Sequence, residues 1–316
     1  MSFLSIIEKV DTFPYFSASS DYYTLVTHDA LTPIGYITSE IAIFLSLETK
    51  YFNVDSQHKL IKISPDLDTF EKRNEAFAFV GEKWKVDPHF EIALGKGWRN
   101  ELYAVYGPDH TPYLLIERAV SVLLGVNTYG VHINGYIEPQ NTSNGKLKVW
   151  VPRRSATKPT YPGKLDNTVA GGIGYPQGIW ETVVKESFEE AGLNEEFVKS
   201  HTRANGVVSY MIQPSLNSSV PPEGLVVQPE VEYTFDLEFD NETDVVPQPE
   251  DGEAESFHLM DVDEVLERIR NDEFKPNCAL IFIDFLIRHG EITAENEPNY
   301  TEIVSRCHRR LPFPTK

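Results

Sequence analysis

Residues 171–193 read GGIGYPQGIWETVVKESFEEAGL, and this stretch decides how the rest of the chain is interpreted. Its first half is rich in glycine, which is typical of a loop. Its second half has the spacing of a strongly amphipathic helix. At about 100° per residue, one side of that helix, which we expect to face the core, carries Trp180, Val184, Phe188 and Ala191.

The opposite side of the expected helix carries three acids, Glu186, Glu189 and Glu190. They are spaced i,i+3 and i,i+4, so their carboxylates lie close together. At about 4 Å near a protein surface, each such pair costs roughly 4 kcal/mol before screening. A cation removes that cost, and Mg²⁺ prefers oxygen ligands of this kind. The alternative is a solvated acidic helix face, which is common in proteins.

The same stretch resembles the Nudix box, G-x5-E-x7-R-E-U-x-E-E-x-G-U, where U is a bulky aliphatic residue. The residues in register are Gly171, Glu186, Glu189, Glu190, Gly192 and Leu193. This chain departs from the pattern at Gln177, Lys185 and Ser187. Lys185 keeps the positive charge of the Arg it replaces. Gln177 removes a carboxylate that supports the loop in the family, so we expect altered metal affinity or rate.

Further segments are similar to one branch of this family, the thiamine pyrophosphokinase-related proteins with an extra N-terminal domain. The similar segments are 73–80, 97–107, 130–136, 150–167, 251–257 and 274–290. Some members carry a kinase domain after the Nudix domain, and we expect none in this chain. The resemblance implies a diphosphatase that acts on thiamine diphosphate and its oxidised (oxo-/oxy-) derivatives, releasing the monophosphate and phosphate.

The resemblance also assigns roles to single residues. Glu186, Glu189 and Glu190 are expected to hold Mg²⁺ or Mn²⁺. A fourth acid from a later loop often completes such a site, and Glu253 is our candidate, with Glu255 as the second choice. The alternative for both is an ordinary solvated loop residue.

Three basic residues on the way to the box, Arg153, Arg154 and Lys158, are candidate ligands of the substrate phosphates. The alternative for each is ordinary surface charge.

Flat rings bind well between aromatic side chains, and a thiazolium adds a cation–π attraction. We therefore expect residues 1–127 to supply a wall for the substrate ring, with Trp98 as the main candidate. The alternative is that Trp98 only fills the core of its own domain.

The predicted fold is of the α/β (α+β) class, with two domains. Residues 1–127 form a smaller mixed α/β domain, and residues 128–316 form a Nudix α/β/α sandwich. Within the first, the run PYLLIERAVSVLLG predicts a buried helix that starts after Pro112 and ends at Gly125. Within the second, His132 and Cys278 are interpreted as core residues.

The composition narrows the possible partners. The 316 residues include 48 acids and 28 Lys or Arg, for a net charge of -20. We therefore expect neither nucleic acid nor an anionic membrane as a partner, because both bind cationic faces. The N-terminus has no pattern of a signal peptide, which favours the cytoplasm. The oligomeric state is left open.

Two alternative functions stay open: hydrolysis of another nucleoside diphosphate derivative such as ADP-ribose, and a non-catalytic Nudix-derived binding protein.

Overall fold

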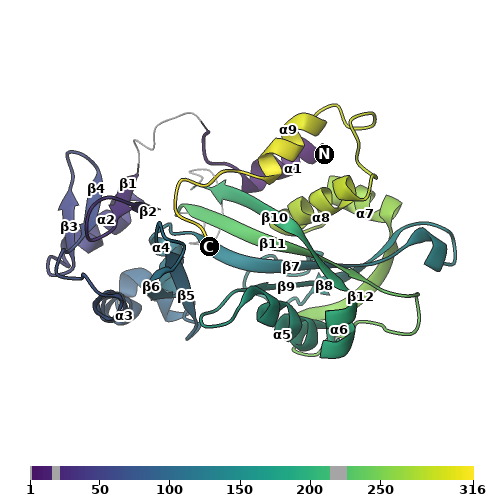
Figure 1. Ribbon diagram of the computed structural model, residues 1–316, viewed down its shortest axis with the longest axis horizontal. Helices are drawn as coiled ribbons and strands as arrows, with labels where there is room; N and C mark the ends of the chain where they lie inside the picture. Colours follow the sequence, from purple (N-terminus) through teal and green to yellow (C-terminus); the bar gives the residue numbers. More distant parts are fainter. Residues whose placement is uncertain (1, 16–21, 214–225) are drawn as a thin grey trace.

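The computed structural model describes residues 2–15, 22–213 and 226–316. Figure 1 shows two regions side by side, a smaller one built from the first part of the chain and a larger one built mainly from the rest. Each has its own apolar core.

The smaller region combines a four-stranded sheet, in the order β2-β1-β4-β3, with a separate hairpin of β5 and β6. Its helix α3 packs against β6, and Trp84 and Phe77 of α3 are buried in the shared core. The elements are β1 (Tyr23–Val26), β2 (Pro33–Ile37), α2 (Ser39–Ser46), β3 (Phe52–Asp55), β4 (Leu60–Ile63), α3 (Phe70–Lys85), the short turns η1 (Pro88–Phe90) and η2 (Glu91–Gly95), β5 (Leu102–Tyr106), β6 (Pro112–Glu117) and α4 (Arg118–Leu123).

The helix predicted between Pro112 and Gly125 is wrong in its first half. Residues 112–117 form strand β6, and only residues 118–123 form helix α4. The strand pairs with β5 in an antiparallel register, with Tyr103 opposite Ile116. Leucine favours a helix, but antiparallel pairing with the preceding strand β5 overrides that preference.

The larger region is a layered sandwich around a mixed sheet in the order β10-β11-β7-β8-β12, with β9 paired to part of β7. Strands β7 and β11 are parallel, and the other pairs are antiparallel. The elements are β7 (Thr128–Ile137), η3 (Pro139–Asn141), β8 (Lys148–Arg154), β9 (Val169–Gly172), α5 (Ile179–Ala191), α6 (Glu195–His201), β10 (Thr202–Ile212), β11 (Gln228–Glu238), β12 (Ala254–Asp261), α7 (Val262–Arg270), α8 (Pro276–Arg288) and α9 (Tyr300–Cys307).

Helices cover both faces of this sheet (Figure 1). Helices α5 and α6 pack on one face, over one apolar cluster. Helices α7, α8 and α9 lie on the other face, over a second apolar cluster. The alternation of buried side chains along β7 and β8 sends successive residues into these two clusters. The predicted α/β class with an α/β/α sandwich is confirmed.

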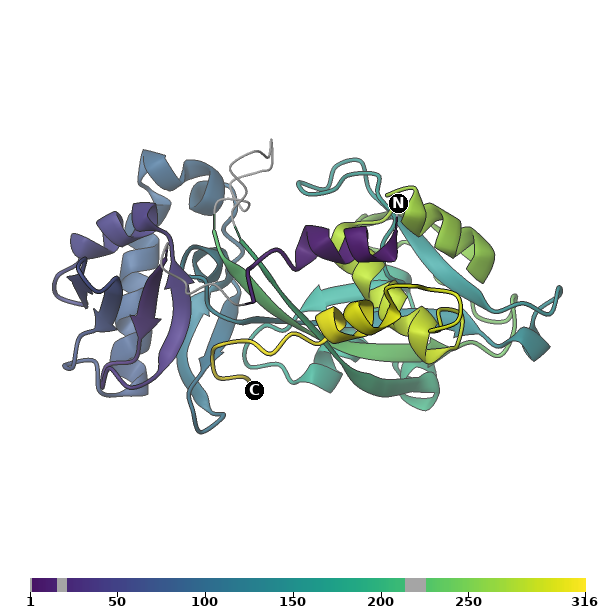
Figure 2. The same cartoon turned by 90° about the horizontal axis from the view of Figure 1, so that it is seen from above.

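The first helix, α1 (Phe3–Val10), lies on the larger region, although it precedes the smaller one in sequence (Figure 2). Its buried residues Phe3, Ile6, Ile7 and Val10 join the cluster beneath α8. Next to it, Asp11 is buried and forms an ion pair of 2.7 Å with Arg309. The structural unit around the larger sheet therefore includes a segment that our boundary at residue 127 assigned to the other domain.

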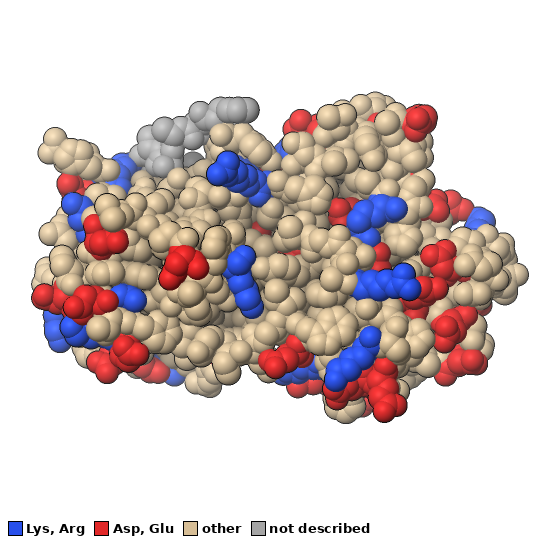
Figure 3. Space-filling view, in the orientation of Figure 1, with Lys and Arg blue, Asp and Glu red and all other residues tan. Residues whose placement is uncertain are grey.

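Acidic and basic side chains alternate over the face drawn in Figure 3. No helix among the described residues is both long and apolar enough to cross a membrane.

Candidate active site

The 171–193 stretch forms the end of strand β9, a loop, and helix α5, as the pattern predicts. The helix begins after Gly178, whose N–H donates to the Glu181 carboxylate at 2.9 Å. It ends at Gly192, which has φ 64°, a left-handed conformation that favours glycine. These two glycines fix the length of the helix and the position of its acids.

The buried side of α5 is not the one predicted. Thr182, Val183, Ser187 and Ala191 are buried, whereas Phe188 is 63% exposed and Trp180 37% exposed. The small side chains of this face suit a close approach of the helix to the sheet. Because of this rotation, Glu190 does not lie on the solvent side of the helix, as we had expected, but turns toward strand β9.

Glu186 and Glu189 are bridged by one ammonium group. The Nζ atom of Lys185 lies 2.8 Å from a carboxylate oxygen of each. Glu186 packs directly over Gly171, where a Cβ atom would overlap its carboxylate. Burial raises the pKa of Glu186, and the contact with Lys185 offsets only part of that shift. The first glycine of the box therefore makes room for the first acid of the helix.

Glu190 reaches the outer edge of strand β9, where it accepts a hydrogen bond of 2.9 Å from the Ala170 N–H. Burial raises its pKa well above the usual range, and the neighbouring carboxylates of Asp166, Glu186 and Glu253 add to the shift. A carboxyl group in such surroundings gains from any cation that reaches it.

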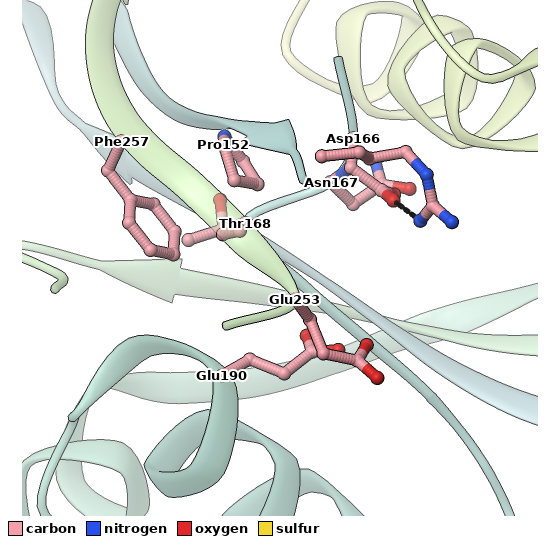
Figure 4. Close-up of a pocket in the computed structure, with 9 residues that line it drawn as sticks. Pro152, Asp166, Asn167, Thr168, Glu190, Glu253 and Phe257 are labelled. Atoms are coloured by element: carbon pink, nitrogen blue, oxygen red, sulfur yellow. Dashed lines mark hydrogen bonds and ion pairs between the residues drawn. The ribbon is translucent and has the colours of Figure 1, made fainter. Parts of the chain in front are cut away.

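Glu253, the candidate fourth acid, meets Glu190 although 63 residues separate them; Figure 4 shows the two side chains together. It lies just before strand β12 and pairs with Lys158. Burial alone would raise the pKa of Glu253, but the hydrogen bonds with Lys158 and Glu190 lower it. The two acids line a cavity of about 20 Å³, which has room for one water or one ion.

The three basic candidates lie in different settings. Arg154 lines the same cavity, and its Nη1 pairs with Asp166 at 2.5 Å. Lys158 is held by Glu253, and Arg153 donates to the carbonyl oxygen of Gly163 at 2.7 Å. Arg154 also donates to two carbonyls of the loop 155–166, so its planar fork holds that loop in place.

The donor set suits a hard divalent cation, because four carboxylates converge on one end of α5 with Lys185 between two of them. Among the described residues, however, no three acidic, His or Cys side chains already stand close enough to hold an ion. The ammonium group of Lys185 occupies the position between Glu186 and Glu189 that a cation would take. A bound ion would need both the Lys185 ammonium group to leave and the carboxylates to move closer together.

The smaller region contacts the loop before α5 through residues other than Trp98, the residue that the sequence analysis named. The N–H of Tyr175, in the loop before α5, donates to the Leu102 carbonyl at 2.7 Å. Arg118, at the start of α4, pairs with Glu101 at 2.9 Å. Burial would lower the pKa of Arg118, but Tyr103 and Glu101, with a smaller contribution from Glu186, raise it. Glu101 lies in segment 97–107, which is similar to the branch, whereas nothing in the sequence analysis pointed to Arg118.

Trp98 lies in the same region but faces its own domain. Its ring packs against helix α3 near Gly81, with the Lys85 Nζ 4.2 Å from the ring centroid. The indole Nε1 donates to the Asn100 side chain at 3.0 Å.

Two segments of the chain match known protein families. Residues 140–279 match the NUDIX domain, and residues 3–128 match a domain of unknown function, DUF4743. The chain is 34% identical to Nudix hydrolase 24, chloroplastic, of Arabidopsis thaliana, over 86% of this chain and 69% of that protein. The chain belongs to the Nudix hydrolase family.

The chain is also similar to two further proteins. The chain is 44% identical to the uncharacterized protein YJR142W of Saccharomyces cerevisiae, over 99% of this chain and 92% of that protein. Among solved structures, the MutT protein of Methanosarcina mazei Go1 aligns with 52% of this chain and 95% of its own, at 15% identity and a TM-score of 0.35. The prediction of a pyrophosphohydrolase enzyme, a hydrolase of acid anhydrides, is confirmed by the family.

Proposed function

We propose that this Nudix hydrolase is a metal-dependent diphosphatase of thiamine diphosphate or its oxidised derivatives, releasing the monophosphate and phosphate. The observation that carries the proposal is that Glu190 lies near both Glu186 and Glu253, while Glu189 is joined to Glu186 through Lys185, beside the bare backbone of Gly171. The thiamine-type substrate is supported by the resemblance of segments along most of the chain.

The proposed ligands of Mg²⁺ or Mn²⁺ are Glu186, Glu189 and Glu190. A bound divalent cation neutralises phosphate oxygens and lowers the pKa of a coordinated water. In this arrangement Lys185 turns from Glu186 and Glu189 toward the phosphates and keeps the local charge balanced. Glu190 is held in place by the Ala170 N–H, so it needs little reorganisation to act.

Glu253 is the proposed general base. It faces Glu190 across the cavity, and its pKa is lowered by Lys158, so it is ionised at neutral pH and able to accept a proton from water. Lys158 and Arg154 stand on the same side and are the proposed contacts for phosphate oxygens. Arg153 is proposed as a third contact, which requires it to leave the Gly163 carbonyl.

Two other functions remain as alternatives. Hydrolysis of another nucleoside diphosphate derivative uses the same acids and differs only in the ring that is recognised. A binding protein without turnover is favoured by one observation, the amide of Gln177 at the position of the box carboxylate.

A screen for phosphate release decides among these. The purified chain is incubated with Mg²⁺ or Mn²⁺ and with thiamine diphosphate, its oxidised forms, ADP-ribose and nucleoside diphosphates. We expect release from the thiamine compounds, abolished by chelation. Preference for ADP-ribose would favour the first alternative, and no release from any compound would favour the second.

A further inference from the structure

A second cavity lies on the side of the larger sheet where Figure 1 shows α8 and α9. Its volume is about 270 Å³, against about 20 Å³ for the cavity at the catalytic acids, and the two cavities share no lining residue. Strands β10 and β11 form its floor, and α8 and α9 form its walls. We call it the α8–α9 cavity. Its size approaches that of the smaller ligand pockets in proteins, about 300 Å³.

A bulge in β10 keeps the floor of this cavity open. The pairing of β10 with β11 shifts between Ala204 and Gly206, so Asn205 has no partner in register. Gly206 has φ 146°, and a Cβ atom added there would meet no atom within 4 Å. Bulges bend a strand locally and are common next to functional sites. The floor is therefore clear of side chains at Gly206.

Asp284 of α8 faces the cavity and is 6% exposed. Its Oδ2 accepts a hydrogen bond of 2.9 Å from the Arg288 Nε. The two Nη atoms of the same arginine donate to Asp236, at 2.6 and 3.0 Å. One guanidinium group therefore serves two buried carboxylates. Within the described residues, the other oxygen of Asp284, Oδ1, accepts no hydrogen bond.

His308, at the mouth of the cavity, presents a second acceptor to Asp284. The His308 Nδ1 lies 2.9 Å from the carbonyl oxygen of Val207, which places the proton of the neutral ring on Nδ1. Nε2 is then an acceptor, and it lies 3.7 Å from the Asp284 Oδ1. This distance is too long for a hydrogen bond even when the ring is protonated. Two acceptors thus face each other without a donor between them, and a buried acceptor without a donor is costly.

The rest of the lining combines negative potential with apolar surface. The last turns of α8 and α9 both line the cavity, and the C-terminal end of a helix favours a positive charge. The side chains of Val207, Ile287 and Val304 add hydrocarbon surface. A ligand with a cationic donor at one end and a short hydrocarbon chain at the other fits both parts.

We propose that the α8–α9 cavity binds a small aliphatic amine as its ammonium ion, with the nitrogen between Asp284 and His308. An ammonium group carries three donors. Two of them reach the Asp284 Oδ1 and the His308 Nε2, and the third reaches the hydroxyl of Thr234 in the floor. The hydrocarbon chain lies against Ile287 and Val304. This site is separate from the catalytic acids and does not depend on the proposed diphosphatase function.

The test titrates n-butylamine into the full chain at pH 7 and follows the heat of binding by calorimetry. The amine is charged at this pH, as a lysine side chain is. We expect saturable binding at one site. Butan-1-ol and butyrate have the same chain length without the positive charge, and we expect neither to bind. Asp284→Asn should weaken the binding of n-butylamine at least about tenfold, because it removes a hydrogen bond to a charged group.

Two further variants keep the test valid if Asp284→Asn unfolds after losing its pair with Arg288. Thr234→Val keeps the shape of the side chain, removes one acceptor and should weaken binding about threefold or more. Val304→Phe fills the cavity from α9 and should abolish binding. The matched control is Glu302→Gln, an exposed acid of α9 outside the lining, which should bind n-butylamine as the natural chain does. Thermal melting checks that each variant is folded.

Several outcomes would overturn the proposal. One is the absence of saturable n-butylamine binding, and another is equal binding of butan-1-ol. Unchanged binding in the folded cavity variants would also contradict it. Glu190→Gln, at the proposed metal site, should leave n-butylamine binding unchanged, and a loss there would place the amine at the catalytic acids instead. None of these measurements depends on turnover, so failure of the diphosphatase proposal leaves the test intact.

Discussion

The Tyr103 hydroxyl, from the hairpin of the smaller region, lies directly over Gly172 at the end of β9 in the larger one. Any side chain at position 172 would occupy the place of that hydroxyl. The glycine therefore permits contact between the two regions, beyond any part it plays in the loop before α5.

Gly172→Ala is expected to lower the Tm by a few degrees, because an added methyl group in a filled contact costs about 1–3 kcal/mol. Tyr103→Phe in the same chain removes the overlapping hydroxyl and leaves the ring Cζ 3.0 Å from the new methyl carbon. The double variant should regain part of the lost Tm. A double-mutant cycle by thermal melting measures this, and additive effects would contradict the contact.

Glu189→Gln and Glu190→Gln should each reduce kcat by at least about a hundredfold, because each removes a charge from the proposed metal site. We expect the fold to persist, with Tm in chelator unchanged or raised as repulsion among the acids is relieved. The readouts are steady-state kinetics with Mg²⁺ and circular dichroism. Glu196→Gln, on the exposed surface of α6, is the control. Full activity of both variants would contradict the assignment of Glu189 and Glu190 as metal ligands.

Gln177→Glu should raise the affinity for Mg²⁺ or the rate modestly, since it restores the box carboxylate. Gln177 sits in the tight turn before α5, where its N–H donates to the Gly174 carbonyl at 2.8 Å. A side-chain change there leaves that hydrogen bond intact. Titration of activity with Mg²⁺ checks the result, and no change in either quantity would mean that the departure is compensated elsewhere.

Trp98→Ala should reduce kcat/KM at least about tenfold on an oxidised thiamine diphosphate and little on a minimal diphosphate ester, if Trp98 forms a wall for the ring. The packing of Trp98 against α3 and Lys85 supports the alternative, a role in the core of its domain. Trp98→Phe keeps an aromatic ring and is the control. Equal losses on both substrates, or a melted protein, would assign Trp98 to structure.

The pH dependence of the free energy of unfolding should reveal the titration of the Glu230 carboxyl group. Burial raises its pKa to about 7, and the Glu232 charge adds to the shift, while the Tyr210 hydroxyl and Lys275 oppose it. The folded state therefore holds a proton that the unfolded state loses near its ordinary value of 4.5. The stability from this proton is complete at low pH and is lost as pH rises through 7.

Glu230→Gln removes that dependence. Between about pH 5 and pH 8, the Tm of the natural chain should fall relative to that of the variant. Melting curves of both proteins across this range provide the measurement, and a constant difference in Tm would show that Glu230 does not titrate there.

The local sequence pattern was sufficient to predict the loop and the helix of the Nudix box. The box spacing predicted the helix that carries Glu186, Glu189 and Glu190, and a strand-to-helix loop before it. Such elements depend on residues within a turn or two of each other, so a short window of sequence contains the relevant information.

The sequence by itself determined the family and the acids on α5, because the spacing of the Nudix box carries both. Only the tertiary structure decided which side of α5 is buried, that Glu190 meets Glu253 and Ala170, and that α1 joins the larger region. It also placed Tyr103 and Arg118 beside Gly172. These contacts join residues tens to hundreds of positions apart, and their energies arise from burial and charge that exist only once the chain is packed.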